Sequence, residues 1–162
     1  MVVIDSDVFL IAHRYVRDVR AELNTRFLAA VKTAAPALTI YNLMEILGVL
    51  SFNLSAVQMR AWPDWLKARH SLAILWPDPN YTSRHLFFEQ VIYHLPLARM
   101  TTQPTAFLDA LAIEVAERTP DVRAFVTWNA RHFANKTRLR VLTPAQYLDE
   151  NGIHPETRSV IR

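Results

Sequence analysis

Short apolar runs alternate along this chain with longer segments in which apolar residues recur every three or four positions. The first pattern is typical of strands buried on both faces, and the second is typical of amphipathic helices. The apolar runs predict strands at residues 2–5, 37–40, 72–76, 122–128 and 140–142. Such strands, separated by helices, predict an α/β fold with a mostly parallel sheet.

The predicted helices fill the intervals between these strands. In the first of them, Val8, Ile11, Ala12 and Tyr15 recur on one face. The helical pattern covers residues 7–19, 21–34, 42–50, 55–70, 82–94, 105–118 and 144–148, and a helical turn is expected at 130–135.

Proline, glycine and polar residues indicate where elements end. We expect Asn42 to be the N-cap of its helix and Pro63 to mark a break or a new first turn. Turn residues occupy 77–80, a polar loop is expected at 100–104, and Gly152 should end the last helix. A length of 162 residues favours one domain, expected over residues 1–150, with a C-terminal tail at 151–162.

Composition narrows the classes of function. The absence of cysteine excludes disulfides, thiolate nucleophiles and cysteine-ligated zinc, and it fits a cytoplasmic location. Gly48 and Gly152 are the only glycines, so a glycine-rich phosphate loop is excluded and nucleotide-dependent kinases and dehydrogenases are disfavoured. We expect neither a signal peptide nor a membrane span. The net charge of +3 is too small by itself to indicate nucleic-acid binding.

Four acidic or amide residues occur where a predicted strand ends or a helix begins: Asp5, Glu45, Asp109 and Asn129. Ligands of open parallel sheets bind beyond the carboxyl ends of the strands. Magnesium is held by a few carboxylates and waters, with substrate phosphate oxygens completing its shell. The pattern therefore suggests a metal site for phosphodiester chemistry.

Each of these positions also has a purely structural explanation. Asp5 or Asp7 would cap the following helix, and Glu45 lies where a capping box would place it. Asp109 gains from the dipole of its helix, and Asn129 suits a turn. Each structural explanation is reasonable alone, but all four together at strand and helix ends are less plausible. This favours a metal site over four unrelated structural roles.

Four segments, taken in order, resemble a PIN domain, and in particular the VapC-like toxins of prokaryotic type II toxin–antitoxin pairs. They are Val-Ile-Asp-Ser-Asp-Val-Phe-Leu at 3–10, Asn-Leu-Met-Glu-Ile-Leu at 42–47, Leu-Asp-Ala-Leu-Ala at 108–112 and Val-Thr-Trp-Asn-Ala-Arg-His-Phe at 126–133. The strand–helix pair at 141–148 also fits. The resemblance implies a three-layer α/β/α fold and metal-dependent ribonuclease activity.

The resemblance also implies roles for individual residues. It assigns catalysis to Asp5, Glu45, Asp109 and Asn129, with the first three as ligands of Mg²⁺ or Mn²⁺ and Asn129 as a weaker ligand or the holder of a metal-bound water. Asp7 and Thr127 would support these ligands. A toxin would act on RNA, bind a small antitoxin and form a homodimer. A catalytically weak RNA-binding module is the alternative, and a DNA-directed nuclease is disfavoured because the chain lacks an arch or helical insert.

Basic residues follow the last of these segments. Arg131, His132, Lys136 and Arg138 are predicted to contact RNA phosphates, although a solvated basic turn explains the cations equally well. No histidine pair has the spacing of a zinc site. Two further groups are expected to be structural or surface residues: Trp62, Trp65 and Trp76 in the core or an interface, and Glu114 and Glu117 facing solvent.

Overall fold

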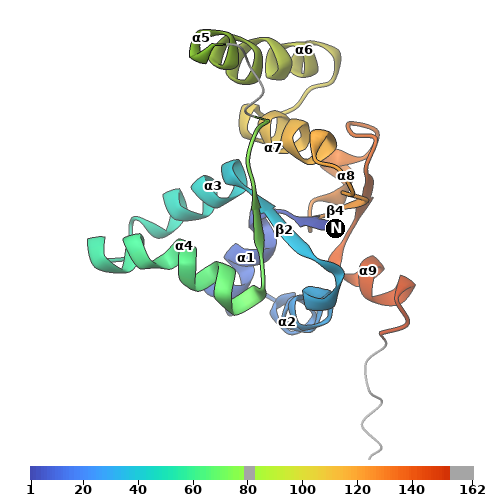
Figure 1. The fold of residues 1–162 in the computed structure, drawn as a ribbon. Helices are drawn as coiled ribbons and strands as arrows, with labels where there is room; N and C mark the ends of the chain where they lie inside the picture. The colour runs from blue at the N-terminus through green and yellow to red at the C-terminus, as the bar shows by residue number, and fades with distance from the viewer. Residues whose placement is uncertain (79–82, 154–162) are drawn as a thin grey trace, which may run out of the picture.

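Five parallel strands form the central layer of the computed structural model, which describes residues 1–78 and 83–153 (Figure 1). Their order across the sheet is β3-β2-β1-β4-β5. The strands are β1 (Val2–Ile4), β2 (Pro36–Thr39), β3 (Ala73–Leu75), β4 (Ala124–Val126) and β5 (Arg140–Leu142). All four strand pairings are parallel, which confirms the predicted α/β class.

Helices cover both faces of this sheet, giving the expected three-layer α/β/α arrangement. The first half of the chain contributes α1 (Ser6–His13), α2 (Ala21–Ala30), the 3₁₀ helix η1 (Val31–Ala34), α3 (Ile40–Leu50) and α4 (Ala56–His70). The second half contributes α5 (Arg84–Phe87), the π-helix η2 (Phe88–His94), α6 (Leu95–Thr102), α7 (Phe107–Arg118), α8 (Ala130–Phe133) and α9 (Pro144–Glu150).

Alternate residues of each strand supply two separate cores. Val2 and Ile4 face one cluster, which α1, α2, α3, α4 and α9 complete. Val3 and Phe125 face the other, where Ile113 of α7 and Phe133 of α8 pack. Successive strand side chains point to opposite faces, so apolar residues at every position are what a sheet covered on both sides requires.

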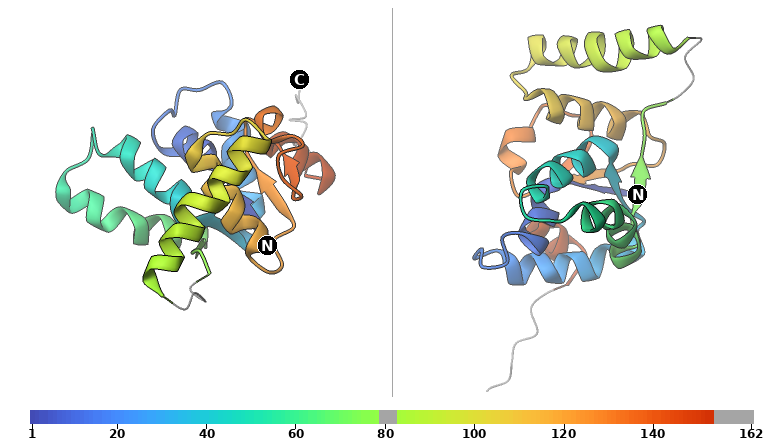
Figure 2. Two further views of the ribbon diagram at one scale, coloured as in Figure 1. Left: turned by 90° about the horizontal axis from the view of Figure 1, so that it is seen from above. Right: turned by 90° about the vertical axis from the view of Figure 1, so that its left-hand side faces the viewer.

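The segment from α5 through η2 to α6 is a continuous helical arm that packs along α7 (Figure 2). The prediction of a polar loop at 100–104 was wrong in its first half, because helix continues to Thr102. The predicted turn at 77–80 and helix at 82–94 fall partly on residues 79–82, which lie outside the described residues.

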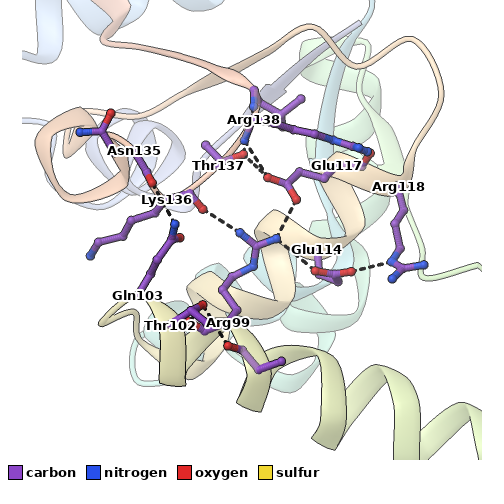
Figure 3. Close-up of polar contacts among 12 residues, drawn as sticks. Arg99, Thr102, Gln103, Glu114, Glu117, Arg118, Asn135, Lys136, Thr137 and Arg138 are labelled. Carbon is purple, nitrogen blue, oxygen red and sulfur yellow. Dashed lines mark hydrogen bonds and ion pairs between the residues drawn. The ribbon is translucent and has the colours of Figure 1, made fainter.

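A buried arginine holds this arm in place (Figure 3). Arg99 Nη2 lies 2.7 Å from Glu117 Oε2 and 3.1 Å from Glu114 Oε2. Arg99 Nη1 donates to the carbonyl oxygen of Lys136 at 2.7 Å. The two glutamate side chains are only 15% and 14% exposed, so the prediction that they face solvent was wrong. The arm supplies the cation that allows their burial.

Three boundary predictions were also wrong. The helix predicted at 7–19 ends at His13, because residues 14–20 fold into turns held by Asp18. Pro63 does not break its helix, since α4 runs through it and keeps Leu66 fully buried. The cap of α3 is Thr39, whose hydroxyl accepts from Asn42 N at 3.1 Å; Asn42 therefore lies inside the helix.

The three tryptophans, predicted in the core or an interface, are not all in the core. Trp76 is 65% exposed and Trp65 is 46% exposed, whereas Trp62 is half-buried against the first cluster. Of the tail predicted at 151–162, residues 154–162 lie outside the described residues. No helix among the described residues is both long enough and apolar enough to cross a membrane.

Candidate functional site

The carboxyl ends of β1, β2 and β4 lie side by side at the centre of the sheet, where the strand order changes direction. Ligands of open parallel sheets bind at such a switch point. Asp5 follows β1 directly and is 6% exposed. Its backbone N–H still donates to Val126 O at 2.9 Å, and its side chain caps α1 by accepting from Ser6 N at 2.8 Å.

A buried amide orients the Asp5 carboxylate. Asn42 Nδ2 donates to Asp5 Oδ1 at 2.8 Å. The orientation of this amide is determined by Thr39, whose hydroxyl donates to Asn42 Oδ1 at 2.5 Å. Thr39 and Asn42 are 0% and 2% exposed, so water does not compete for these bonds.

Ser6 connects Asp5 to Glu45. The Ser6 hydroxyl donates to Glu45 Oε2 at 2.6 Å. Its oxygen, Ser6 Oγ, lies 3.5 Å from Asp5 Oδ1. Glu45 projects from α3 and is partly buried. Two carboxylates separated by 40 positions in the chain therefore meet around one hydroxyl, as their positions at strand and helix ends suggested.

Asp7 is held by the residues that follow β4. Its Oδ2 accepts from the Thr127 hydroxyl at 3.0 Å and from Trp128 N at 2.9 Å. The Thr127 oxygen accepts in turn from Asn129 N at 3.0 Å. Asp7 Oδ1 is buried and has no hydrogen-bond partner among the described residues. Such an oxygen is a candidate to bind a cation or a proton donor.

Asp109 lies in the first turn of α7, and His132 Nε2 lies 3.2 Å from its Oδ2. Asn129 is exposed and begins α8 without a side-chain cap. The structure thus links Asp5 and Glu45 through Ser6, and it places Asp7 and Asp109 near enough to Asp5 to repel its charge.

Burial and mutual repulsion act on these carboxyl groups. Burial first, then Asp7 and Asp109, raise the pKa of Asp5 well above its usual value of 3.8. Burial also raises the pKa of Asp7, against the hydrogen bonds it accepts from Thr127 and Trp128. The pKa of Asp109 is raised by burial, although neighbouring His132 opposes the shift. A group of acids held in this way is a common feature of functional sites.

The donor set determines which ion the site would suit. All candidate ligands are carboxylate or amide oxygens, which suit Mg²⁺ and Mn²⁺ rather than softer metals. Among the described residues, no three His, Asp or Glu side chains converge closely enough to form a complete metal site. Magnesium commonly takes one or two carboxylates and fills its shell with water and phosphate. The partnerless oxygen of Asp7 and the raised pKa values fit a bound cation of this kind.

The structure gives most of the predicted RNA-contacting cations partners within the protein. Lys136 Nζ donates to Pro104 O, and Arg138 Nη2 donates to Glu117 O. His132 contacts Asp109, while Arg131 is exposed.

Sequence reasoning missed the roles of Ser6, Thr39 and Asn42. Two local features could have drawn attention to them: Ser6 follows Asp5 directly, and Thr39 ends the strand that precedes the helix of Asn42. The partners of those side chains depend on which strands are neighbours in the sheet.

The chain matches no protein-family model and no curated protein.

Proposed function

We propose that this protein is a metal-dependent ribonuclease of the PIN-domain type and the toxin of a VapC-like toxin–antitoxin pair. The observation that carries the proposal is the meeting of Asp5 and Glu45 around Ser6, beside Asp7, at the switch point of a parallel sheet. Hard oxygen ligands at this place suit an ion that acts on phosphate. The order of the four PIN-like segments adds independent support.

Asp5, Glu45 and Asp109 would hold Mg²⁺ or Mn²⁺, with Asn129 as a weaker ligand. When bound, the ion supplies an activated water and offsets the charge that develops on the phosphate. The protein contributes the orientation of its ligands. Asn42 and Ser6 N position Oδ1 of Asp5, and the Ser6 hydroxyl positions Glu45.

Asp7, in the first turn of α1, has a supporting role in this scheme. Its Oδ2 accepts hydrogen bonds from Thr127 and Trp128. These bonds fix the carboxylate, and its buried Oδ1, which has no partner within the described part of the chain, remains free to accept from a metal-bound water. His132 holds Asp109 by its contact of 3.2 Å. Arg131 is exposed beside these residues and is available to bind a phosphate of the RNA.

The alternative is a PIN-fold RNA-binding module with weak or no catalysis. Two observations favour it: Asn129 lacks the charge of an aspartate, and no three acids converge in metal-binding geometry among the described residues. Against it, the site retains Asp5, Glu45 and Asp109, and the charge of buried Asp5 is costly without a bound cation.

Exposed apolar side chains support the proposed protein partners, a small antitoxin and a second copy of the chain. Met44 on α3 is 58% exposed, and Phe107 and Leu108 on the adjoining α7 are 43% and 42% exposed. Phe52, just after α3, is 88% exposed. Large apolar side chains left exposed on neighbouring helices are a common feature of protein interfaces.

The test is cleavage of total and structured RNA by the wild type and by Asp5→Asn, with Mg²⁺, with Mn²⁺ and with EDTA. Metal-dependent cleavage that Asp5→Asn loses is the expected result. Undiminished metal-dependent cleavage by Asp5→Asn would refute the assigned site. If no metal supports cleavage, Mn²⁺ titration by calorimetry distinguishes a metal-binding enzyme with a narrow substrate from a binding module.

A further inference from the structure

Residues 14–20 connect α1 to α2 in a loop that projects from the body of the molecule, shown in blue in both views of Figure 2. The loop surrounds a hollow of about 540 Å³, lined by Arg14, Tyr15, Val16, Arg17 and Asp18. We refer to it as the 14–18 hollow. None of its residues belongs to the proposed metal site.

Hydrogen bonds within the loop keep the hollow in shape. Tyr15 N donates to Leu10 O at 2.8 Å, and Asp18 N donates to Tyr15 O at 2.9 Å. The Asp18 carboxylate accepts from Arg20 at its backbone N, Nε and Nη2, at 2.9, 2.8 and 2.7 Å. A ligand would therefore meet a surface that is already formed, which lowers the entropy lost on binding.

The hollow carries positive charge that the protein does not neutralise. Arg14 and Arg17 are exposed, and within residues 1–78 and 83–153 neither forms an ion pair. The Arg14 guanidinium lies 5.7 Å from the centroid of the Tyr15 ring, which is itself 49% exposed. At the other basic segment, Arg140 pairs with the Glu150 carboxylate, and Arg138 donates to the backbone carbonyl oxygen of Glu117.

A series of contacts connects the hollow to the candidate site. Arg20, fixed by Asp18, lies over the Trp128 ring at 5.5 Å. Trp128 N donates to Asp7 Oδ2 at 2.9 Å, and its indole N–H donates to Asn24 at 2.7 Å. Hydrogen bonding to Asp18, and more weakly the charge of Asp7, raise the pKa of Arg20. Contacts thus link the loop around the hollow to the Asp7 side of the acidic site.

We propose that the 14–18 hollow binds single-stranded RNA that extends from the metal site, with Arg14 and Arg17 on phosphates and Tyr15 stacked on a base. The inference rests on the proposed ribonuclease function and names a substrate-binding surface for it. Unpaired arginines beside an exposed aromatic ring are the combination that binds single strands without sequence preference. The neighbouring acids do not attract a nucleic-acid strand, so a cationic surface beside them supplies the attraction for the RNA backbone with or without a bound ion.

The test measures binding apart from cleavage. Fluorescence anisotropy with a labelled short oligouridine is recorded in EDTA, so that the strand stays intact. Arg14→Ala/Arg17→Ala is compared with a control of equal charge loss, Arg60→Ala/Arg123→Ala, whose residues are exposed elsewhere. We expect about a tenfold loss of affinity in the first variant, no change in the control, and a salt slope smaller by about 1.4 for two lost phosphate contacts. Tyr15→Ala should weaken binding at least about fivefold.

Equal binding by the wild type and Arg14→Ala/Arg17→Ala overturns the inference, as does a wild type that does not bind. If polyglutamate displaces the RNA at equal charge concentration, the hollow is a site for acidic proteins and the inference is also wrong. Cleavage is then assayed with Mn²⁺. Binding that depends on Arg14 and Arg17 without any cleavage supports the surface, and Mn²⁺ titration by calorimetry then distinguishes a ribonuclease with a narrow substrate from a binding module. Cleavage by the double variant at the wild-type rate supports the ribonuclease and contradicts the proposed RNA-binding surface.

Discussion

Asn42 Nδ2 donates to Asp5 Oδ1 at 2.8 Å, joining two residues that are 37 positions apart. The first lies in α3 and the second at the end of β1, and they meet because β1 and β2 are neighbours in the sheet. This bond orients a carboxylate that would otherwise be buried with fewer donors. It makes Asn42 the central structural support of the candidate site.

Asn42→Ala is therefore expected to lower both stability and activity. It removes the acceptor of the Thr39 hydroxyl proton and one of the donors to Asp5 Oδ1, both in a buried place, at a cost of about 1–3 kcal/mol. Urea unfolding measures the loss of stability, and RNA cleavage should fall about tenfold or more because Asp5 is no longer held in orientation. Asn53→Ala, at an exposed position, is the control and should change neither. Wild-type cleavage by Asn42→Ala would show that the bond is not needed to orient Asp5.

Asp5→Asn is expected to stabilise the metal-free protein at neutral pH. The raised pKa of Asp5, caused by burial and then by Asp7, means that ionisation at pH 7 disfavours folding. The amide keeps the Oδ1 acceptor and removes the charge. Thermal unfolding in EDTA should show a higher midpoint for Asp5→Asn than for the wild type, with exposed Asp149→Asn as the unchanged control.

Mn²⁺ should reverse this order of stability. A ligand that binds only the folded state raises its stability by mass action. The wild type should gain in melting temperature as Mn²⁺ is added, whereas Asp5→Asn should gain little. Equal gains in both proteins would place the ion elsewhere.

Arg99→Gln is expected to destabilise the protein by about 3–5 kcal/mol, because Glu114 and Glu117 are left charged in a largely buried position. The matched control is Arg118→Gln, which removes an exposed cation from Glu114 and should cost less than about 1 kcal/mol. Chemical unfolding of the two variants gives the comparison. Arg99→Lys should not restore stability, because lysine lacks the planar group that reaches both glutamates and Lys136 O. Similar losses in Arg99→Gln and Arg118→Gln would show that the arm is not held by Arg99.

A histidine pair predicts acid sensitivity. His13 Nε2 and His70 Nε2 lie 3.0 Å apart between the C-terminal ends of α1 and α4. Burial lowers the pKa of both from 6.5 to about 4, with Arg69 adding to the shift of His13 and His13 adding to that of His70. In this pH range the unfolded chain binds more protons, so the pair's contribution to stability is full above about pH 6.5 and is lost as the pH falls towards 4.

Replacing both histidines tests this dependence. The free energy of unfolding is measured from neutral pH to about 4.5 for the wild type and for His13→Gln/His70→Gln. The variant should lose less stability on acidification, whereas His85→Gln, at an 80% exposed position, should follow the wild type. Parallel curves for all three proteins would exclude the pair as the cause.

The elements of this fold were predictable because their signals are local. The run at 140–142 matches β5 residue for residue, and Pro144 and Gly152 bracket α9 as their backbone preferences require. Some boundaries were not predictable from periodicity. Residues 14–20 leave the helical pattern where the carboxylate of Asp18 binds Arg20, a local contact that apolar spacing does not reveal. Helix α4 continues past Pro63, and Leu66 beyond it is buried in the core.

For the candidate site, too, the sequence revealed one part and the tertiary structure the other. Its acids could be located from the sequence, since Asp5 ends an apolar run and Glu45 and Asp109 interrupt the apolar pattern of their helices. Their partners could not, because a side chain's spacing along the chain does not reveal which strand lies beside it. The same limit explains Glu117, whose partner Arg99 belongs to a different helix.

The amino-acid sequence by itself determined the alternation of strands and helices, the strand-end positions of the acids and the absence of thiol chemistry. Tertiary structure alone decided that β1 lies between β2 and β4, that Asn42 and Ser6 reach Asp5 and Glu45, and that Lys136, Arg138 and Arg140 have hydrogen-bond partners within the protein. The reason is physical. Periodicity and capping act over a few residues, whereas hydrogen bonds, ion pairs and burial depend on which surfaces the whole chain packs together.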